Sequence, residues 1–154
     1  MSDCAERALA ELAALWVRER ESTRERVRAE RQRWTLTERV ERGVSLRDLV
    51  VDESDAAVGG RVVLWLRPNV ATRFEDVRIA PGEPVRLWSK DPEGEDVEPG
   101  VVTRIERTRI GVAVSAEHRP FLDHGAFALD REAPEVSFDR AARAIANLRA
   151  GKPG

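Results

Sequence analysis

The first 34 residues show a narrow apolar stripe at helical spacing. Apolar or small side chains recur every three or four positions among Arg and Glu, which is the period of an α-helix. The stripe is narrower than the apolar face of a core helix, so we expect a long, exposed helix that packs one edge against a partner helix. Asp3 and Glu6 have the spacing of a capping box at its start. The stripe comprises Ala5, Leu9, Leu12, Trp16, Thr23, Val27 and Trp34.

A change of period after residue 43 predicts a sheet. Thr35 and Glu38 again have capping-box spacing, which predicts a short second helix that ends near Gly43. Beyond it, the period is two residues, as in Val62, Leu64 and Leu66, which alternate with residues 63, 65 and 67. Gly and Pro turn signals separate the segments, and no helix intervenes, so we expect an antiparallel sheet closed into a small barrel of about six strands. The predicted strands are 44–52, 62–67, 85–89, 100–107, 109–115 and 126–130.

The last 21 residues predict another helix. Pro134 suits a first helical turn, and Gly151 and Pro153 end the segment. We expect the two end helices to pair as a stalk that carries the barrel, an α+β fold in which 1–34, 35–133 and 134–154 form one structural unit. Such a layout is typical of a module inserted into, or fused to, a larger protein. The residues expected to pack in the stalk are Leu9, Leu12, Trp16, Val27, Trp34, Phe138, Ile145 and Leu148.

Charge and composition narrow the function classes. Charged residues make up 35% of the chain and the net charge is −2, which excludes a surface built throughout to bind nucleic acid but allows a local basic patch. One cysteine, Cys4, and two histidines exclude a disulfide framework and a Cys-rich zinc site. The longest apolar runs, such as 12–17, are far shorter than the ~18 residues of a membrane span, and no signal peptide is visible. We therefore expect a cytoplasmic protein with no membrane partner.

Five segments, taken in order, resemble the Upf-type superfamily-1 helicases, in particular the immunoglobulin-mu-binding-protein branch and its bacterial relatives. The resemblance implies the region called domain 1B, in which a stalk of two helices carries a β-barrel beside the first RecA-like motor domain. The barrel of such enzymes lies near the path of the single strand. The segments are Arg42-Gly43-Val44-Ser45-Leu46, Gly60-Arg61-Val62-Val63-Leu64, Pro81-Gly82-Glu83-Pro84-Val85, the hairpin Gly100-Val101-Val102-Thr103-Arg104 to Ile110-Gly111-Val112-Ala113-Val114, and Glu135-Val136-Ser137-Phe138-Asp139-Arg140.

The sequence departs from the helicases in lacking their motor. Nothing reads G-x-x-x-x-G-K-[ST], and Gly151-Lys152 has neither a preceding strand nor a following Ser or Thr. We therefore expect a non-catalytic accessory region without cofactor. Its expected partners are single-stranded DNA or RNA, bound weakly and without sequence preference, and helicase motor domains in cis or trans. The alternative is a stand-alone interaction module that grips a protein through its stalk and touches no nucleic acid.

The candidate nucleic-acid contacts lie on the predicted 100–115 hairpin. Arg104, Arg107 and Arg109 lie on or beside its turn, and Thr103 and Thr108 add hydroxyls. Arginines contact phosphates without reading sequence. The alternative is that these side chains are solvated and face Glu106 or the acidic 91–98 loop.

The remaining candidates have competing structural interpretations. Trp65 and Trp88 offer rings on which bases stack, or they seal the join between barrel and stalk. The loop 91–98 has five carboxylates but lacks an EF-hand register, so we expect no metal site. His118 and His124 have no activated Ser or Cys partner in the sequence, so we expect two loop histidines and no catalytic residue.

Overall fold

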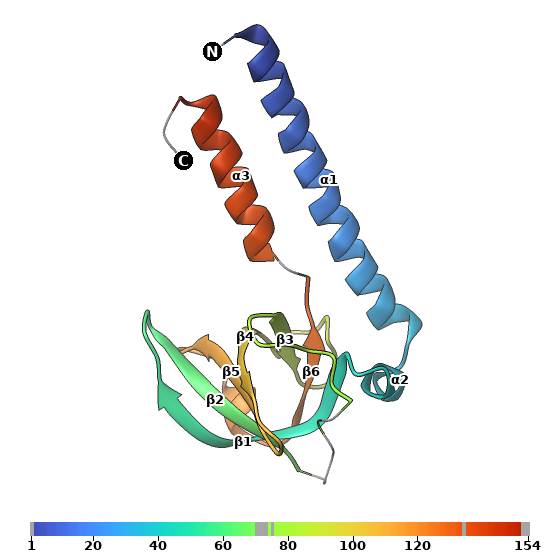
Figure 1. Cartoon of the computed structure of the whole chain (residues 1–154). Helices are drawn as coiled ribbons and strands as arrows, with labels where there is room; N and C mark the ends of the chain where they lie inside the picture. The colour runs from blue at the N-terminus through green and yellow to red at the C-terminus, as the bar shows by residue number, and fades with distance from the viewer. Residues whose placement is uncertain (1, 70–73, 75, 134, 152–154) are drawn as a thin grey trace. The chain divides into compact units, whose positions relative to one another are not determined.

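The computed structural model describes residues 2–69, 74, 76–133 and 135–151. They form an α+β fold, with helices near both ends of the chain and six strands between them in sequence (Figure 1). The expected fold class is therefore confirmed. The helices are α1 (Asp3–Arg33), α2 (Leu36–Glu41) and α3 (Glu135–Arg149), and a short 3-10 helix, η1, spans Pro120–Asp123. The strands are β1 (Ser45–Ala56), β2 (Arg61–Pro68), β3 (Pro84–Trp88), β4 (Val97–Ile105), β5 (Ile110–Ser115) and β6 (Phe127–Arg131).

The six strands close into a barrel. Their order is β1-β2-β5-β4-β3-β6, with β6 returning to β1, and every neighbouring pair is antiparallel. Closure gives each described strand a neighbour on both sides, so the sheet has no free edge strand. The register shifts once in each of three ladders, between Leu46 and Leu49, between Val51 and Glu53, and between Val102 and Arg104. Such bulges bend strands enough to close a small barrel.

The alternating strand residues fill the barrel. In β2, Leu64 and Leu66 are buried while Arg67 is exposed, and in β5 Ile110 and Val112 have no exposed surface. A two-residue period places every second side chain on the inner face. The core cluster comprises Leu46, Leu49, Leu64, Leu66, Phe74, Ile79, Val85, Leu87, Val102, Ile110, Val112, Val114, Leu122, Phe127 and Leu129.

Gly43 ends α2 in the left-handed conformation that the sequence predicted. Its φ is +77°, and a Cβ atom built there would lie 2.2 Å from the carbonyl oxygen of Asp76. The amide of Arg78 donates to the Gly43 carbonyl oxygen at 2.8 Å. The incoming segment therefore lies directly against the Gly43 backbone, which only a residue without a side chain permits.

The helices α1 and α3 pair antiparallel as a second structural unit (Figure 1). The rings of Trp16 and Phe138 meet edge to face at 5.5 Å, and Arg149 pairs with Glu6 at 2.6 Å. The start of α1 differs from the expected capping box. Ser2 caps the helix by accepting from the Ala5 amide at 3.3 Å, because Asp3 is already inside the helix and Glu6 is engaged by Arg149.

The chain divides into two compact units whose bounds differ from the composition segments. One unit contains residues 1–29 and 133–154, and the other contains residues 30–132. The last turn of α1 thus belongs with the barrel. None of the helices in the described ranges combines the length and apolarity needed to cross a membrane.

Candidate nucleic-acid interface

The hairpin between β4 and β5 presents two exposed arginines. Its turn is closed by the Glu106 amide, which donates to the Arg109 carbonyl oxygen at 2.9 Å. Arg104 lies at the bulge of β4 and Arg107 lies in the turn, and both are exposed, as is Thr108. Across the described parts of the chain, neither Arg104 nor Arg107 makes a side-chain hydrogen bond or ion pair. Both positive charges are therefore available to an outside anion.

Arg109 is bound within the barrel unit. Its guanidinium donates to Glu53 Oε2 and to Glu106 Oε1, each at 2.8 Å. Hydrogen bonds from Arg109 to Glu53 and then Glu106 raise the pKa of Arg109 above its ordinary value. The guanidinium also lies 4.1 Å from the centre of the Trp65 ring. Of the three hairpin arginines, Arg109 thus adopts the alternative arrangement, in which the side chain faces Glu106.

Trp65 is half-buried on the outside of β2. Arg109 lies over its ring, and a Cβ built on Gly111 would lie 3.2 Å from a ring carbon. The indole nitrogen donates to Asp55 Oδ2 at 3.0 Å, and Thr103 lies beside the ring, with its hydroxyl oxygen 2.7 Å from the same built Cβ. The ring therefore packs against Gly111 and is already stacked on Arg109, which favours the packing interpretation of Trp65 over base stacking.

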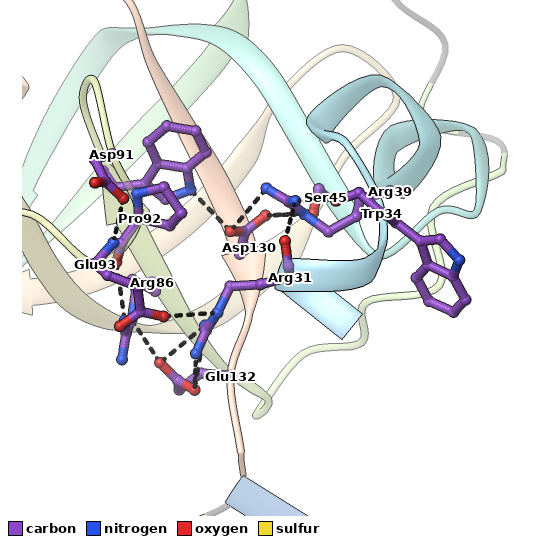
Figure 2. A network of polar contacts seen from close by, with 11 residues as sticks. Arg31, Trp34, Arg39, Ser45, Arg86, Asp91, Pro92, Glu93, Asp130 and Glu132 are labelled. Atoms are coloured by element: carbon purple, nitrogen blue, oxygen red, sulfur yellow. Dashed lines mark hydrogen bonds and ion pairs between the residues drawn. The ribbon is translucent and has the colours of Figure 1, made fainter. Parts of the chain in front are cut away.

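Trp88 belongs to a buried polar network that the sequence did not predict, centred on Asp130. Figure 2 shows Asp130 with Arg39 and Ser45. The Trp88 indole nitrogen donates to Asp130 Oδ2 at 2.9 Å, and Arg39 Nε donates to Asp130 Oδ1 at 3.2 Å. The Ser45 hydroxyl donates to the same carboxylate. Arg39 is 4% exposed and Asp130 is 1% exposed. Trp88 is thus a structural residue of the barrel unit, held by α2, β1 and β6.

The same network fastens the end of α1 to the barrel. Arg39 Nη1 donates to the Arg31 carbonyl oxygen at 3.2 Å and to the Trp34 carbonyl oxygen at 2.7 Å. Carbonyl groups at the end of a helix have no donor within the helix, so Arg39 supplies one. Arg31 pairs with Glu132 and Glu93 at 3.4 Å each (Figure 2). The acidic loop therefore supplies a structural ion pair at Glu93. One sequence signal was available: Asp130 is a charged residue that directly follows the apolar run 127–129.

The predicted stalk residues fall into four groups. Trp16, Phe138 and Ile145 line an apolar hollow of about 140 Å³ between α1 and α3, and Leu9 and Val27 are half-buried on α1. Leu12 and Leu148 are exposed by 42% and 50%. Trp34 lies in the barrel unit, where its ring is 3.8 Å from the Arg42 guanidinium carbon.

Within the described ranges, no group of three or more His, Cys, Asp or Glu side chains is arranged to hold a metal ion. His118 has both ring nitrogens engaged, Nδ1 at 3.1 Å from the Ser115 carbonyl oxygen and Nε2 at 3.3 Å from Asp123 Oδ1. It is a loop residue that braces η1.

The comparison with protein families gives one match. The family described as "Helicase SMUBP-2/HCS1, 1B domain" matches residues 10–134. The matched range contains α1 from residue 10 onward, α2 and all six strands, about four fifths of the chain. The helix α3 lies beyond it. None of the curated proteins matches the chain significantly.

Proposed function

Because this chain belongs to the 1B-domain family of the helicases SMUBP-2/HCS1, we propose that it guides or clamps single-stranded nucleic acid for a helicase motor. Membership confirms the resemblance drawn from the five sequence segments. The chain is an accessory domain of a helicase and contains no motor domain. The proposal adds two activities to that identity: contact between the barrel and a nucleic-acid strand, and coupling of that contact to an ATPase core.

The observation that carries the strand contact is the pair of unneutralised arginines on the β4–β5 hairpin. Arg104 and Arg107 extend into solvent from a turn and a bulge, while Arg109 is already bound by Glu53 and Glu106. Exposed guanidinium groups contact phosphates and carry no base-specific information. Since only two such charges lie on the hairpin and the whole chain has a net charge of −2, the affinity is weak, sensitive to salt and independent of sequence.

Fluorescence anisotropy with a labelled dT12 or rU12 oligonucleotide at low salt tests the strand contact. The chain binds the oligonucleotide, and Arg104→Gln combined with Arg107→Gln lowers the affinity about tenfold, or ~1.4 kcal/mol. The matched control is Arg61→Gln, because Arg61 is also exposed at the start of a barrel strand and its replacement removes the same charge elsewhere. The proposal is wrong if the unmodified chain does not bind, or if Arg61→Gln weakens binding as much per charge.

Support for coupling comes from the two-helix unit. No residue of α1 is fully buried, and Leu12 and Leu15, three positions apart on one face of the helix, remain 42% and 58% exposed. Apolar surface of this kind is typical of a face that a larger protein covers. Titration calorimetry with a separately produced motor region from a helicase of this family tests the coupling. Leu12→Glu with Leu15→Glu abolishes binding, whereas Glu11→Gln on the same helix leaves it unchanged.

The same exposed face favours a second candidate function, a protein-interaction module that makes no nucleic-acid contact. The two candidates differ in the anisotropy experiment. A chain that binds a protein through Leu12 and Leu15 but ignores dT12 and rU12 at low salt is an interaction module and not a strand guide.

A further inference from the structure

A small pocket lies in the barrel unit, away from the hairpin. It is a hollow of about 150 Å³ between the start of α2, the bulge of β1, the turn after β3 and the start of β6. Its lining includes three large apolar side chains, those of Leu36, Trp88 and Phe127. Trp88 is 8% exposed and Phe127 is 3% exposed, so the fold already holds both side chains in place.

The rim of this pocket has two unusual backbone positions. Among described residues other than glycine, only Asp48 and Lys90 have a positive φ, +51° for Asp48 and +71° for Lys90, and both line this pocket. A Cβ atom clashes with the backbone in this conformation, which therefore favours glycine. An Asp side chain often compensates by a local hydrogen bond, which a Lys side chain does not form. Strained residues persist where the surrounding structure determines them and gather at binding sites. Two of them at one pocket therefore indicate a site rather than an accident of a turn.

The charge of the rim favours an anion. The part of the chain that the structure describes supplies no hydrogen bond or ion pair to the Lys90 side chain, which is exposed. Arg47 is the second cation of the rim, and it pairs with Asp48 at 3.3 Å and with the Thr37 hydroxyl at 3.0 Å. Asp48 offsets Arg47, which leaves Lys90 as the uncompensated charge. A ligand that fits this arrangement has an anionic group beside a small flat ring that contacts both apolar and polar atoms.

We propose that this pocket holds one nucleotide of the single strand, with the base against Trp88 and Phe127 and its phosphate at Lys90. The proposal rests on the proposed strand contact and extends it to a second position. Because drug-sized ligands occupy about 300–1,000 Å³, a hollow of this size accepts one ring and not a dinucleotide. Contact with these side chains does not distinguish one base from another, which agrees with binding that is independent of sequence.

The strand β1 connects the pocket to the hairpin. Asp48 at the pocket and Glu53, which binds Arg109 of the hairpin, both lie on β1. Five residues of a strand span roughly 16 Å at about 3.3 Å per residue. Single-strand nucleic-acid sites on small barrels extend over about 4–16 nucleotides. One bound oligonucleotide is therefore long enough to reach both the pocket and the hairpin.

Substitutions at Lys90 separate the effect of its positive charge on binding from the effect of its backbone conformation. In Lys90→Asn the charge is lost, while Asn tolerates a positive φ, so the turn is retained. Lys90→Arg is the matched control, since it retains the charge. We expect Lys90→Asn to weaken dT12 binding about threefold to fivefold in anisotropy, and Lys90→Arg to bind within about twofold of the unmodified chain. Ala126→Leu, which adds bulk to an exposed residue of the rim, weakens binding without a change of charge.

The second measurement locates the ligand by NMR. Addition of dT12 shifts the amide signals of residues 89–91 and 126–128, and these shifts persist in Arg104→Gln/Arg107→Gln but disappear in Lys90→Asn. Thymidine 5′-monophosphate at higher concentration shifts the same amides. Inorganic phosphate moves residues 89–91 alone, since it has no base to reach residues 126–128.

The outcomes distinguish the two proposals. If dT12 binds normally to Lys90→Asn and the pocket amides do not move, the pocket proposal is wrong and the hairpin contact stands. If the unmodified chain binds no oligonucleotide, the strand contact and the pocket proposal both fail. The pocket proposal is also overturned if inorganic phosphate reproduces every shift, or if a polyglutamate peptide displaces dT12 with equal affinity, because the site then recognises charge or a protein segment and not a nucleotide.

Discussion

Replacement of Asp130 by Asn tests whether the buried network holds the barrel unit together. The Asp130 carboxylate accepts hydrogen bonds from Arg39, from the Ser45 hydroxyl and from the Trp88 indole. Asn has the same shape but no charge, and its amide nitrogen donates where the carboxylate oxygen accepted. One of the present donors therefore faces another donor, and Arg39 retains a buried positive charge without its partner.

The magnitude follows from the burial of the pair. The side chains of Arg39 and Asp130 are 5% and 2% exposed, so solvent offers little compensation. Breaking a buried pair by removing one partner costs about 3–5 kcal/mol, and we expect Asp130→Asn to lie in that range. Glu132→Gln is the control, because Glu132 pairs with Arg86 and Arg31 while 21% of its side chain stays exposed. Its loss costs about 1 kcal/mol or less.

The assay is urea unfolding followed by tryptophan fluorescence, together with native-state amide exchange at Leu87 and Leu129 in the barrel core. The urea midpoint falls while the slope is unchanged, as for a variant that alters only stability. Arg39→Met combined with Asp130→Asn destabilises less than the sum of the single changes, because no buried charge remains unpaired. A loss below about 1 kcal/mol for Asp130→Asn, or additivity in the double variant, would refute the reasoning.

Three further predictions concern other parts of the molecule. Gly82→Ala lowers the free energy of unfolding by about 1 kcal/mol, because the φ of Gly82 is +90° although the space around it is open. Gly43→Ala lowers it by roughly 3 kcal/mol or more, because the new Cβ also meets the Asp76 carbonyl oxygen. Equal losses in urea unfolding would contradict this difference. Arg109→Gln leaves dT12 affinity within about twofold of the unmodified chain, since its guanidinium is already bound to Glu53 and Glu106; an anisotropy loss as large as that of Arg104→Gln would show that the strand displaces those carboxylates. Phe138→Ala removes the ring that meets Trp16 and lowers the stability of the two-helix unit by about 3–5 kcal/mol. Amide exchange becomes faster in α3, while the barrel amides keep their protection. Faster exchange in both units would mean that they unfold as one.

The periodic features of the fold could be predicted from the sequence. The alternation of Leu64 and Leu66 with Trp65 and Arg67 placed β2 correctly, because a two-residue period is a local property of the chain. The Thr35 cap was also predicted, and the Glu38 amide does donate to its hydroxyl at 3.2 Å. Both features depend on neighbours within a few residues.

The partners of individual charges could not be predicted in this way. Arg39 meets Asp130 across 91 positions of sequence, and Arg109 meets Glu53 across 56. In a chain with 26 basic and 28 acidic residues, many such pairings are compatible with the composition. Only the barrel register selects among them. The same register brings Asp48 and Lys90 to one pocket, which explains why the pocket was not visible in the sequence.

The salt dependence of oligonucleotide binding tests the central claim most directly. Each phosphate contact on a single strand contributes about −0.7 to the slope of log K against log salt concentration. If Arg104 and Arg107 each contact a phosphate, Arg104→Gln/Arg107→Gln makes the slope for dT12 shallower by about 1.4, while Arg61→Gln leaves it unchanged. A slope that is the same in all three proteins would contradict the claim that this barrel holds a nucleic-acid strand through its hairpin.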